Sequence, residues 1–254
     1  MNLIINADDL GYNEEVNTAT FDLCSRNLLS SATLIMNAPS VDGAIDRLRD
    51  FPNCSFGVHL NLTEFRPLTS SPALQSLQKT NGDFDGDAVL SKMLSKPVRD
   101  AIFQEWSSQI ARLIGAGIVP SHLDSHHHVH TLPLLFPILK KLQRRFSIKR
   151  VRLTKNVYGP DQPFSSYLLM RKCAWNTMLR LWYPTITTSG FTSLAEFHDL
   201  VTNGEIGRWV RDKTSTIIEL MVHPGNPLFD RETALLYSDW ASVHEFNLLS
   251  YSDL

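Results

Sequence analysis

The sequence predicts an α/β fold: an irregular (β/α) barrel of about seven parallel strands, folded as a single domain over residues 1–254. Short apolar runs alternate with helix-length segments, an order typical of parallel strands joined by right-handed crossovers. Polar side chains gather where the apolar runs end, and barrels keep their active sites at the carboxyl ends of strands. An open doubly wound sheet is the alternative, but the glycine-rich nucleotide loops that often accompany it are absent from the sequence.

The first strand and helix have clear local signals. The apolar run Leu3–Ile5 predicts a buried strand, and two carboxylates, Asp8 and Asp9, follow at its carboxyl end before a glycine turn. Asn13 is placed to cap the helix that follows. The next expected elements are a strand at 31–36, a short helix at 40–48 and a strand at 55–62.

The middle of the chain contains the longest irregular stretch and the longest helix. Residues 63–87 are rich in Ser, Thr, Pro, Asn, Asp and Gly, and a loop of that length inside a compact domain is usually functional. We interpret it as an insertion that covers the substrate, with a surface loop as the alternative. Pro97 then begins an amphipathic helix that ends at the turn 115–117.

The second half continues the alternation. The helix expected over 167–182 is apolar enough to be buried or to support an oligomer interface, and Ser193 with Glu196 forms a capping-box start. The remaining expected elements are a strand with its exit loop at 120–130, a helix at 134–146, a strand at 148–153, a helix at 193–201, a buried strand at 216–222 and a closing helix at 231–246.

Composition and charge exclude several classes of protein. A hydrophobic content of 43% allows a sizeable core, and a net charge of −2 gives no general reason to expect nucleic acid or an anionic membrane as a partner. The three cysteines are scattered, which fits free thiols in a reducing compartment. There is no secretory signal at the N-terminus and no apolar run of membrane-spanning length. We therefore expect a cytoplasmic protein.

Histidines are concentrated in one short stretch. Five of the nine lie within residues 122–130. In an extended segment alternate side chains share a face. The groups that would then point one way are Asp124, His126, His128 and His130. Imidazole and carboxylate are ligands of first-row metals, and flanking apolar residues argue against a surface polyhistidine tract. We therefore expect a metal or catalytic site.

Other strand ends supply the partners that such a site needs. Two imidazoles and one carboxylate hold a divalent ion with positions open for water and substrate, and the ion activates the water and polarises a carbonyl. Asp8 and Asp9 are adjacent, so their side chains diverge in an extended chain, and one can ligate while the other acts as base. His223, before a Pro-Gly turn, is placed to act as general acid. Alternation alone does not choose between His126 and His128 as the ligand.

A basic run admits two interpretations. Eight basic residues and no acidic one lie between Lys140 and Lys155. The favoured interpretation is a solvated helix face followed by a strand end. The alternative is that Arg152 meets an anionic or polar part of a substrate. A nucleic-acid role would rest on this run alone and is not expected.

Four motifs follow one another along the chain: NADDLG at 6–11, GVHLNL at 57–62, HLDSHHHVH at 122–130 and ELMVHPG at 219–225. In this order they resemble the motifs of the YdjC-like carbohydrate deacetylases, of which chitooligosaccharide deacetylases are the best-known members. The histidine motif is the most specific of the four. Leu10 stands where the family often has Phe, and Leu153-Thr154 follow Arg152 where a Pro is common.

The resemblance implies a divalent ion held by Asp9, His59 and His126, with Asp8 as general base and His223 as general acid. It implies hydrolysis of an acetamide in N-acetylated amino sugars, such as short chitooligosaccharides with or without a phosphate, by a cytoplasmic homodimer. Mg or Zn is expected, with Mn, Co or Ni as alternatives. The residues expected to contact substrate or support the ligands are Asn61, Asp124, His128, His130, Arg152 and Glu219.

Two other functions fit the same residues. A metal-dependent phosphoesterase or amidohydrolase on a similar barrel would release phosphate or open a cyclic amide instead of releasing acetate. A non-catalytic protein that binds metal or sugar would retain the ion without turning over any N-acetyl sugar.

Overall fold

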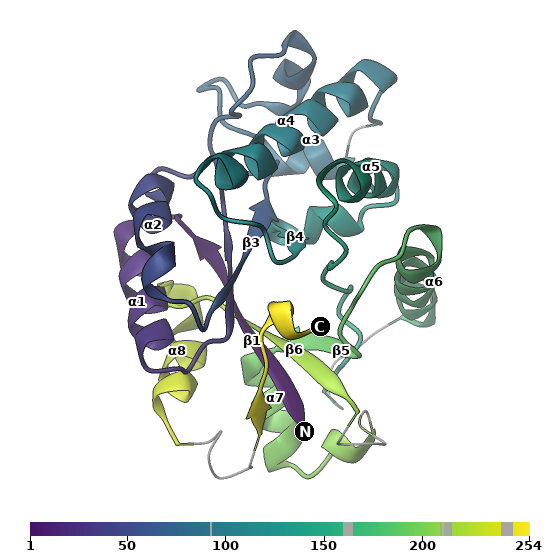
Figure 1. Ribbon diagram of the computed structural model, residues 1–254. Helices are drawn as coiled ribbons and strands as arrows, with labels where there is room; N and C mark the ends of the chain where they lie inside the picture. Colours follow the sequence, from purple (N-terminus) through teal and green to yellow (C-terminus); the bar gives the residue numbers. More distant parts are fainter. Residues whose placement is uncertain (92, 160–164, 209, 211–214, 240–245) are drawn as a thin grey trace.

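In the computed structural model, parallel strands form a sheet that curls into a half-barrel surrounded by helices (Figure 1). The structure describes residues 1–91, 93–159, 165–208, 210, 215–239 and 246–254. The strands in these ranges are β1 (Asn2–Leu10), β2 (Ser31–Leu34), β3 (Ser55–Leu60), β4 (Leu123–Ser125), β5 (Gly190–Ser193), β6 (Ile217–Val222) and β7 (Asn247–Leu248). Their spatial order is β4-β3-β2-β1-β6-β5, with β7 also paired to β1, and the pairings are parallel. The predicted fold class, an irregular barrel in a single domain, is confirmed.

Helices cover the sheet on several sides. They are α1 (Glu14–Ser25), α2 (Val41–Arg47), α3 (Gly86–Ser91), α4 (Lys96–Gly115), α5 (Phe136–Phe146), α6 (Ser166–Trp182), α7 (Leu194–Thr202) and α8 (Asp230–Tyr237). Helices α1, α2 and α8 lie on one side, α3, α4 and α5 at the top and α6 on the opposite side (Figure 1). No helix within the described ranges is both long and apolar enough to cross a membrane.

The helix starts follow the capping signals of the sequence. The side chain of Asn13 accepts a hydrogen bond from the Val16 N–H at 2.8 Å, as predicted for the first cap. The hydroxyl of Ser193 accepts from the Glu196 N–H at 3.4 Å. The closing helix ends at Tyr237 rather than continuing to 246, and residues 240–245 of that prediction lie outside the described ranges.

The strand predicted at 148–153 is wrong as a regular element. Val151 bridges to Leu123 of β4 and Arg150 to Ile186, each as an isolated residue pair. Further along, the N–H of residue 157 donates to the carbonyl of Phe191 in β5 at 3.3 Å. Because this segment contacts the two edge strands in turn, it closes the side of the barrel that the regular strands leave open.

The stretch 63–87 is more ordered than its composition predicts. It contains a 3-10 segment, Pro72–Leu77, and the start of α3. The buried carboxylate of Glu105 on α4 accepts hydrogen bonds from the N–H groups of Leu68 and Thr69 at 3.0 and 2.8 Å. A carboxylate that satisfies backbone donors in this way pins the stretch to α4.

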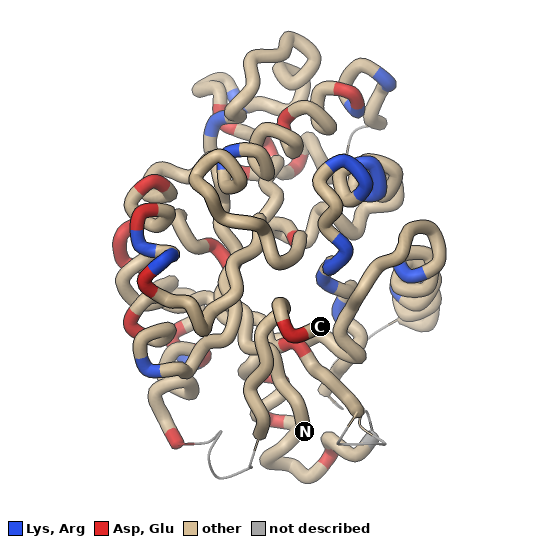
Figure 2. Tube along the Cα trace, viewed as in Figure 1, with Lys and Arg blue, Asp and Glu red and all other residues tan. Residues whose placement is uncertain are grey.

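The basic run is only partly a solvated face. Figure 2 shows its blue residues along α5 and the segment after it. Lys140 is buried and donates to Gln143 and to the carbonyl of Leu179, at 2.9 and 2.7 Å. Arg152 is also completely buried. Lys140 and Arg152 are therefore exceptions to the predicted solvated face, because oxygen acceptors inside the protein satisfy their charged groups.

Candidate metal centre

The adjacent aspartates of β1 lie in a β-bulge. The pairing of β1 with β2 shifts register between Ala7 and Leu10, and Asp9 has a left-handed backbone with φ of 66°. A bulge re-aims side chains that a regular strand would point to opposite faces. Oδ2 of Asp8 lies 3.9 Å and Oδ1 of Asp9 3.3 Å from Nε2 of His59. The expected divergence therefore does not occur, and both carboxylates face one imidazole.

Three elements bring the expected ligand residues together. Asp9 comes from β1, His59 from β3 and His126 from the turn after β4. Oδ1 of Asp9 lies 2.8 Å from Nδ1 of His126, and one donor atom from each residue lies within 4.8 Å of the other two. Ligands about 2.0–2.1 Å from a tetrahedral ion stand about 3.4 Å apart. The 3.3 Å between Asp9 and His59 suits a shared cation.

The histidine-rich stretch is a turn rather than an extended strand. β4 ends at Ser125, and a 3-10 segment, His126–Thr131, follows, in which His127 and His128 have φ of 51° and 54°. Positive φ is uncommon for such residues and often marks functional sites. The predicted alternation of faces is wrong beyond Asp124, because it assumed extended backbone.

A buried pair of groups orients His59. Oδ1 of Asp124 lies 2.7 Å from Nδ1 of His59, and the Thr33 hydroxyl lies 3.1 Å from the same nitrogen. That hydroxyl also donates to Oδ2 of Asp124 at 3.1 Å. Outer partners of this kind fix the ring of a metal-bound imidazole and direct its other nitrogen to the ion. Asp124 therefore lies where a supporting role was expected.

Arg152 lies behind Asp8 at the centre of an ion-pair network. Its guanidinium donates to both oxygens of Asp8 at 2.6 Å, contacts Oδ2 of Asp124 at 2.8 Å and donates to Oε1 of Glu219 at 2.7 Å. Burial alone would raise the pKa of Asp8, but Arg152 and His59 hold it well below its usual range. Three carboxylates occupy the buried guanidinium, so the structure offers no support for the alternative in which Arg152 meets an anionic or polar part of a substrate.

Glu219 has a second partner from the last residues of the chain. The Tyr251 hydroxyl donates to Oε2 of Glu219 at 2.5 Å, and its ring stacks on His122 with centroids 3.5 Å apart. Burial raises the pKa of Glu219 to about 7, although Arg152 and Tyr251 pull in the opposite direction. Glu219 contacts buried protein groups: it binds Nε of Arg152, whereas Asp8 binds the Nη1 and Nη2 atoms of the same guanidinium.

His223 lies alongside Asp8 at the end of β6. In the pairing of β1 with β6, Val222 stands opposite Ala7, so the next residues are His223 and Asp8. Oε2 of Glu232 lies 3.3 Å from Nδ1 of His223 and accepts the backbone N–H of His223 at 3.1 Å. Burial lowers the pKa of His223, but Glu232 and the nearby aspartates outweigh it and raise the pKa above its usual value.

The remaining expected residues take three different positions. Asn61 is buried, and its Oδ1 accepts from the N–H groups of Thr63 and Glu64 at 2.9 and 3.2 Å, which shapes the turn after β3. His130 is buried with Nδ1 at 2.6 Å from the Ser125 hydroxyl. His128 lines a cavity, and burial lowers its pKa to about 3.

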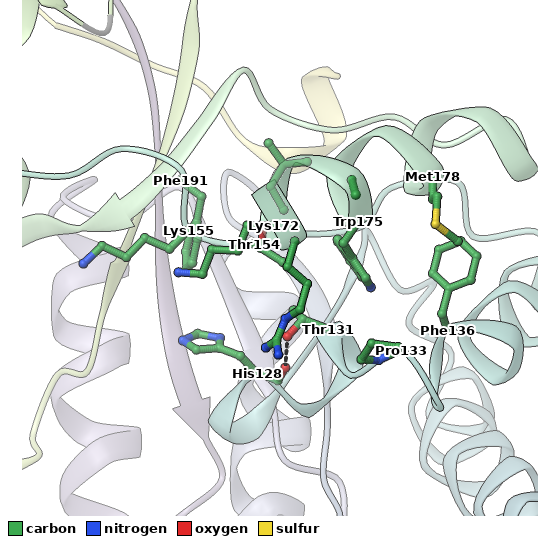
Figure 3. A pocket seen from close by; sticks show the side chains of 13 residues that line it. His128, Thr131, Pro133, Phe136, Thr154, Lys155, Lys172, Trp175, Met178 and Phe191 are labelled. Carbon is green, nitrogen blue, oxygen red and sulfur yellow. Dashed lines mark hydrogen bonds between the residues drawn. The ribbon is translucent and has the colours of Figure 1, made fainter. Parts of the chain in front are cut away.

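This cavity lies on the α6 side of His128 and is about 250 Å³ in volume (Figure 3). Its walls include the rings of Phe136, Trp175 and Phe191, and Lys172 also lines it. Within the described part of the chain, Nδ1 of His128 and Nε1 of Trp175 are buried without hydrogen-bond partners. An apolar cavity with a few polar groups is a common form of ligand site.

The donor set at Asp9 fits a small divalent cation. Oδ1 of Asp9 lies 3.3 Å from Nε2 of His59 and 2.8 Å from Nδ1 of His126, and a carboxylate with two imidazoles is a donor set that divalent ions bind. Buried charges are normally paired or bound to metals, and among the described residues Arg152 is the one arginine or lysine that pairs with the carboxylates of Asp8, Asp124 and Glu219. A dication at the Asp9, His59 and His126 atoms would compensate the excess negative charge.

Sequence reasoning missed four residues of this centre: Thr33, Glu64, Glu232 and Tyr251. Thr33 had a usable signal, since it lies in a predicted buried strand where a hydroxyl needs a partner. The other three lie in a loop, a helix and the final residues of the chain. Their contacts depend on tertiary packing, which no local pattern encodes.

Comparison with known proteins adds a family and a fold. The sequence matches the family described as YdjC-like protein over residues 2–253. A carbohydrate deacetylase of Geobacillus stearothermophilus is 36% identical over 169 residues, covering 62% of this chain and 66% of that protein. A carbohydrate deacetylase of Halalkalibacterium halodurans is 31% identical over 149 residues, covering 58% and 62%. The matched region thus spans less than two thirds of each relative's own length.

A solved structure shares the fold over its whole length. It comes from Enterococcus faecalis V583 and is provisionally named a cellobiose-phosphate cleavage protein. It covers 99% of this chain and 98% of its own, with a TM-score of 0.78 and 21% sequence identity. At that identity the likeness establishes the barrel architecture.

Proposed function

The chain belongs to the YdjC-like protein family, and we propose that it is a metal-dependent deacetylase that removes an acetyl group from N-acetylated amino sugars. Relatives at 36% and 31% identity are named carbohydrate deacetylases. The observation that carries the proposal is the arrangement at the strand ends. Donor atoms of Asp9, His59 and His126 lie close enough together to hold one ion, and Asp8 and His223 follow paired positions of β1 and β6 beside them.

Asp9, His59 and His126 would hold the divalent ion, Zn or Mg by preference, with Mn, Co or Ni as alternatives. When bound, such an ion supplies a Lewis acid that activates water and polarises the acetyl carbonyl. Asp124 supports the set by fixing the ring of His59 at 2.7 Å.

Asp8 is the proposed general base. Its contacts with Arg152 keep it ionised and fix its orientation, as does the Asn6 amide that donates to Oδ1 at 2.8 Å. A proton acceptor must be deprotonated when the substrate arrives, and these contacts secure that state. Asp8 would accept the proton of the attacking water.

His223 is the proposed general acid. Glu232 raises the pKa of His223, so its imidazole stays protonated to higher pH than a free histidine. It would donate a proton to the departing nitrogen as the carbon–nitrogen bond breaks. The products are acetate and a free amino sugar.

The cavity beside His128 is the proposed site for the sugar. Aromatic walls such as Trp175 suit the apolar faces of sugar rings, and Arg171 and Lys172 supply positive charge for a substrate that carries a phosphate. We propose a short chitooligosaccharide such as N,N′-diacetylchitobiose, with or without a phosphate. We also propose that the enzyme acts in the cytoplasm.

A homodimer is proposed from the outer face of α6. Tyr167, Met170, Leu181 and Trp182 are between 64% and 80% exposed there, an unusual density of large apolar side chains. Light scattering should give twice the chain mass, and Leu181→Glu should give a single chain. A single-chain mass for the wild type would reject this part of the proposal.

The proposed reaction is tested by its product. The metal-loaded chain should release acetate from N,N′-diacetylchitobiose or its phosphate, and a chelator should abolish the release. Asp9→Ala and His126→Ala should do the same, whereas His198→Asn, a histidine change on α7, serves as the matched control. Unchanged activity in Asp9→Ala would reject the assignment, and phosphate release from a simple ester would favour a phosphoesterase.

A further inference from the structure

The two ring nitrogens of His126 face different groups. Nδ1 lies 2.8 Å from Oδ1 of Asp9, on the inner side. Nε2 lies 3.6 Å from Oε1 of Glu64, on the outer side. From this we infer that the turn holds a second divalent cation, coordinated by Glu64, His126 and His127. The inference rests on the proposed function, because the inner ion and the outer ion share His126.

The distances on the outer side suit ligands better than a hydrogen bond. A separation of 3.6 Å is too long for a hydrogen bond between Nε2 of His126 and Glu64. It is close to the separation of about 3.4 Å between two ligands of one tetrahedral ion. A nitrogen of His127 completes the group, and the three donor atoms lie within 4.8 Å of one another.

The outer ring nitrogen of His126, Nε2, makes no hydrogen bond within the described part of the chain. His126 is 7% exposed, and this nitrogen is buried. A buried polar atom without a partner destabilises the fold. A cation at this point would satisfy it.

Neighbouring residues hold the outer groups in place. The Thr63 hydroxyl lies 2.9 Å from Nδ1 of His127, which fixes that ring. The backbone of Glu64 is tied on both sides by Asn61: the N–H donates to Oδ1 at 3.2 Å and the carbonyl accepts from Nδ2 at 2.7 Å. The site is therefore built by the loop after β3 and the histidine turn together.

The outer site differs from the inner one in exposure and charge. The Glu64 side chain is 32% exposed and His127 is exposed, so water would fill the remaining positions. It contains one carboxylate, whereas the inner site has Asp8 beside Asp9. Like the inner site, it offers two imidazoles and one carboxylate, a donor set that suits zinc. Binding on both sides of His126 requires loss of both ring N–H protons, so the second ion releases a proton to solvent.

The test counts bound zinc. Tag-free wild-type chain is equilibrated with saturating Zn²⁺ in a buffered solution, freed of excess ion and analysed for metal per chain. We expect two ions in the wild type and one in Glu64→Gln and in His127→Asn. His198→Asn should retain two, and thermal unfolding checks that each variant is folded.

The outcomes separate the two proposals. One ion per wild-type chain at saturation, or two ions in both Glu64→Gln and His127→Asn, overturns the outer site and leaves the inner site intact. No bound ion in the wild type removes both the outer site and the metal dependence of the proposed reaction. Cobalt substitution gives an independent count, since a second equivalent should add its own visible absorption only when both residues are present.

Discussion

At the scale of single residues, each imidazole of the centre is tuned by the carboxylate beside it. Asp124 lies behind His59, and Glu232 lies beside His223. The first pair directs a nitrogen towards the proposed ion, and the second favours the protonated ring. Two histidines, one on β3 and one after β6, are therefore set up for different tasks.

Glu232→Gln should narrow the range of pH in which the enzyme is active. The carboxylate of Glu232 raises the pKa of His223, mainly through its hydrogen bond, so its loss lowers that pKa and the acid form disappears at a lower pH. The alkaline limb of kcat/KM should move to lower pH, with little change in metal content. Glu232→Asp should restore part of the shift. An unmoved alkaline limb would remove His223 from the role of acid.

Tyr251→Phe should cost stability, and more at high pH. The change keeps the ring on His122 but removes the donor to Glu219, at a cost of about 1–3 kcal/mol. The folded pKa of Glu219 is about 7, above its usual value, so ionising it costs stability as the pH rises through that range. The hydrogen bond from Tyr251 favours the ionised form of Glu219. The loss in the free energy of unfolding caused by Tyr251→Phe should therefore be larger at pH 8 than at pH 5. Urea unfolding of the wild type and the variant at pH 5 and pH 8 measures this loss. An equal loss at the two pH values would contradict the role given to Tyr251.

The residue scale also marks a limit of prediction from sequence. The pairing of Asp8 and Asp9 with histidines was readable from residue types and strand ends. Their shared orientation was not, because it depends on the bulge and the left-handed Asp9. Only the family resemblance distinguished His126 from His128, since the turn at His127 removes the alternation that spacing relies on.

At the scale of elements, the site depends on the close approach of β3 and β4. Gly57 lies where a Cβ atom would stand 2.6 Å from Nδ1 and 2.8 Å from the backbone oxygen of His122. Only a residue without a side chain permits this spacing. His59 lies two residues further along β3, so the spacing at Gly57 affects a proposed ligand.

Gly57→Ala should destabilise the fold by about 1–3 kcal/mol, the usual cost of overpacking, and weaken metal binding through His59. Thermal unfolding and zinc content measure the two effects. Gly115→Ala is a matched control, because a Cβ there meets nothing within 4 Å. Equal melting temperatures for the two variants would show that the strand spacing is not tight.

Elements with strong periodicity were predictable, and short ones were not. The helices near 97–115 and 167–182 and the strand at 216–222 lie where predicted, within a residue or two at each end. β5 and β7 are four and two residues long, too short to carry a periodic signal. Their pairing is decided by tertiary contacts.

At the scale of the whole molecule, a buried ion-pair network joins the irregular segment of the barrel to three of its strands. Arg152 comes from the irregular segment that joins the edge strands, and it pairs with carboxylates from β1, β4 and β6. The strand order brings these ends together, although Asp8 and Arg152 are 144 residues apart in sequence. Alternation of strands and helices predicted the architecture, but the network itself needed the folded chain.

The dependence of acetate release on bound metal tests the central claim most directly. Metal-free chain is titrated with Zn²⁺ and assayed on N,N′-diacetylchitobiose after each addition. Release should be absent without metal, rise in proportion to the first equivalent bound, and stay absent in Asp9→Asn at any zinc concentration. Full acetate release by the metal-free chain, or by Asp9→Asn, would contradict the account.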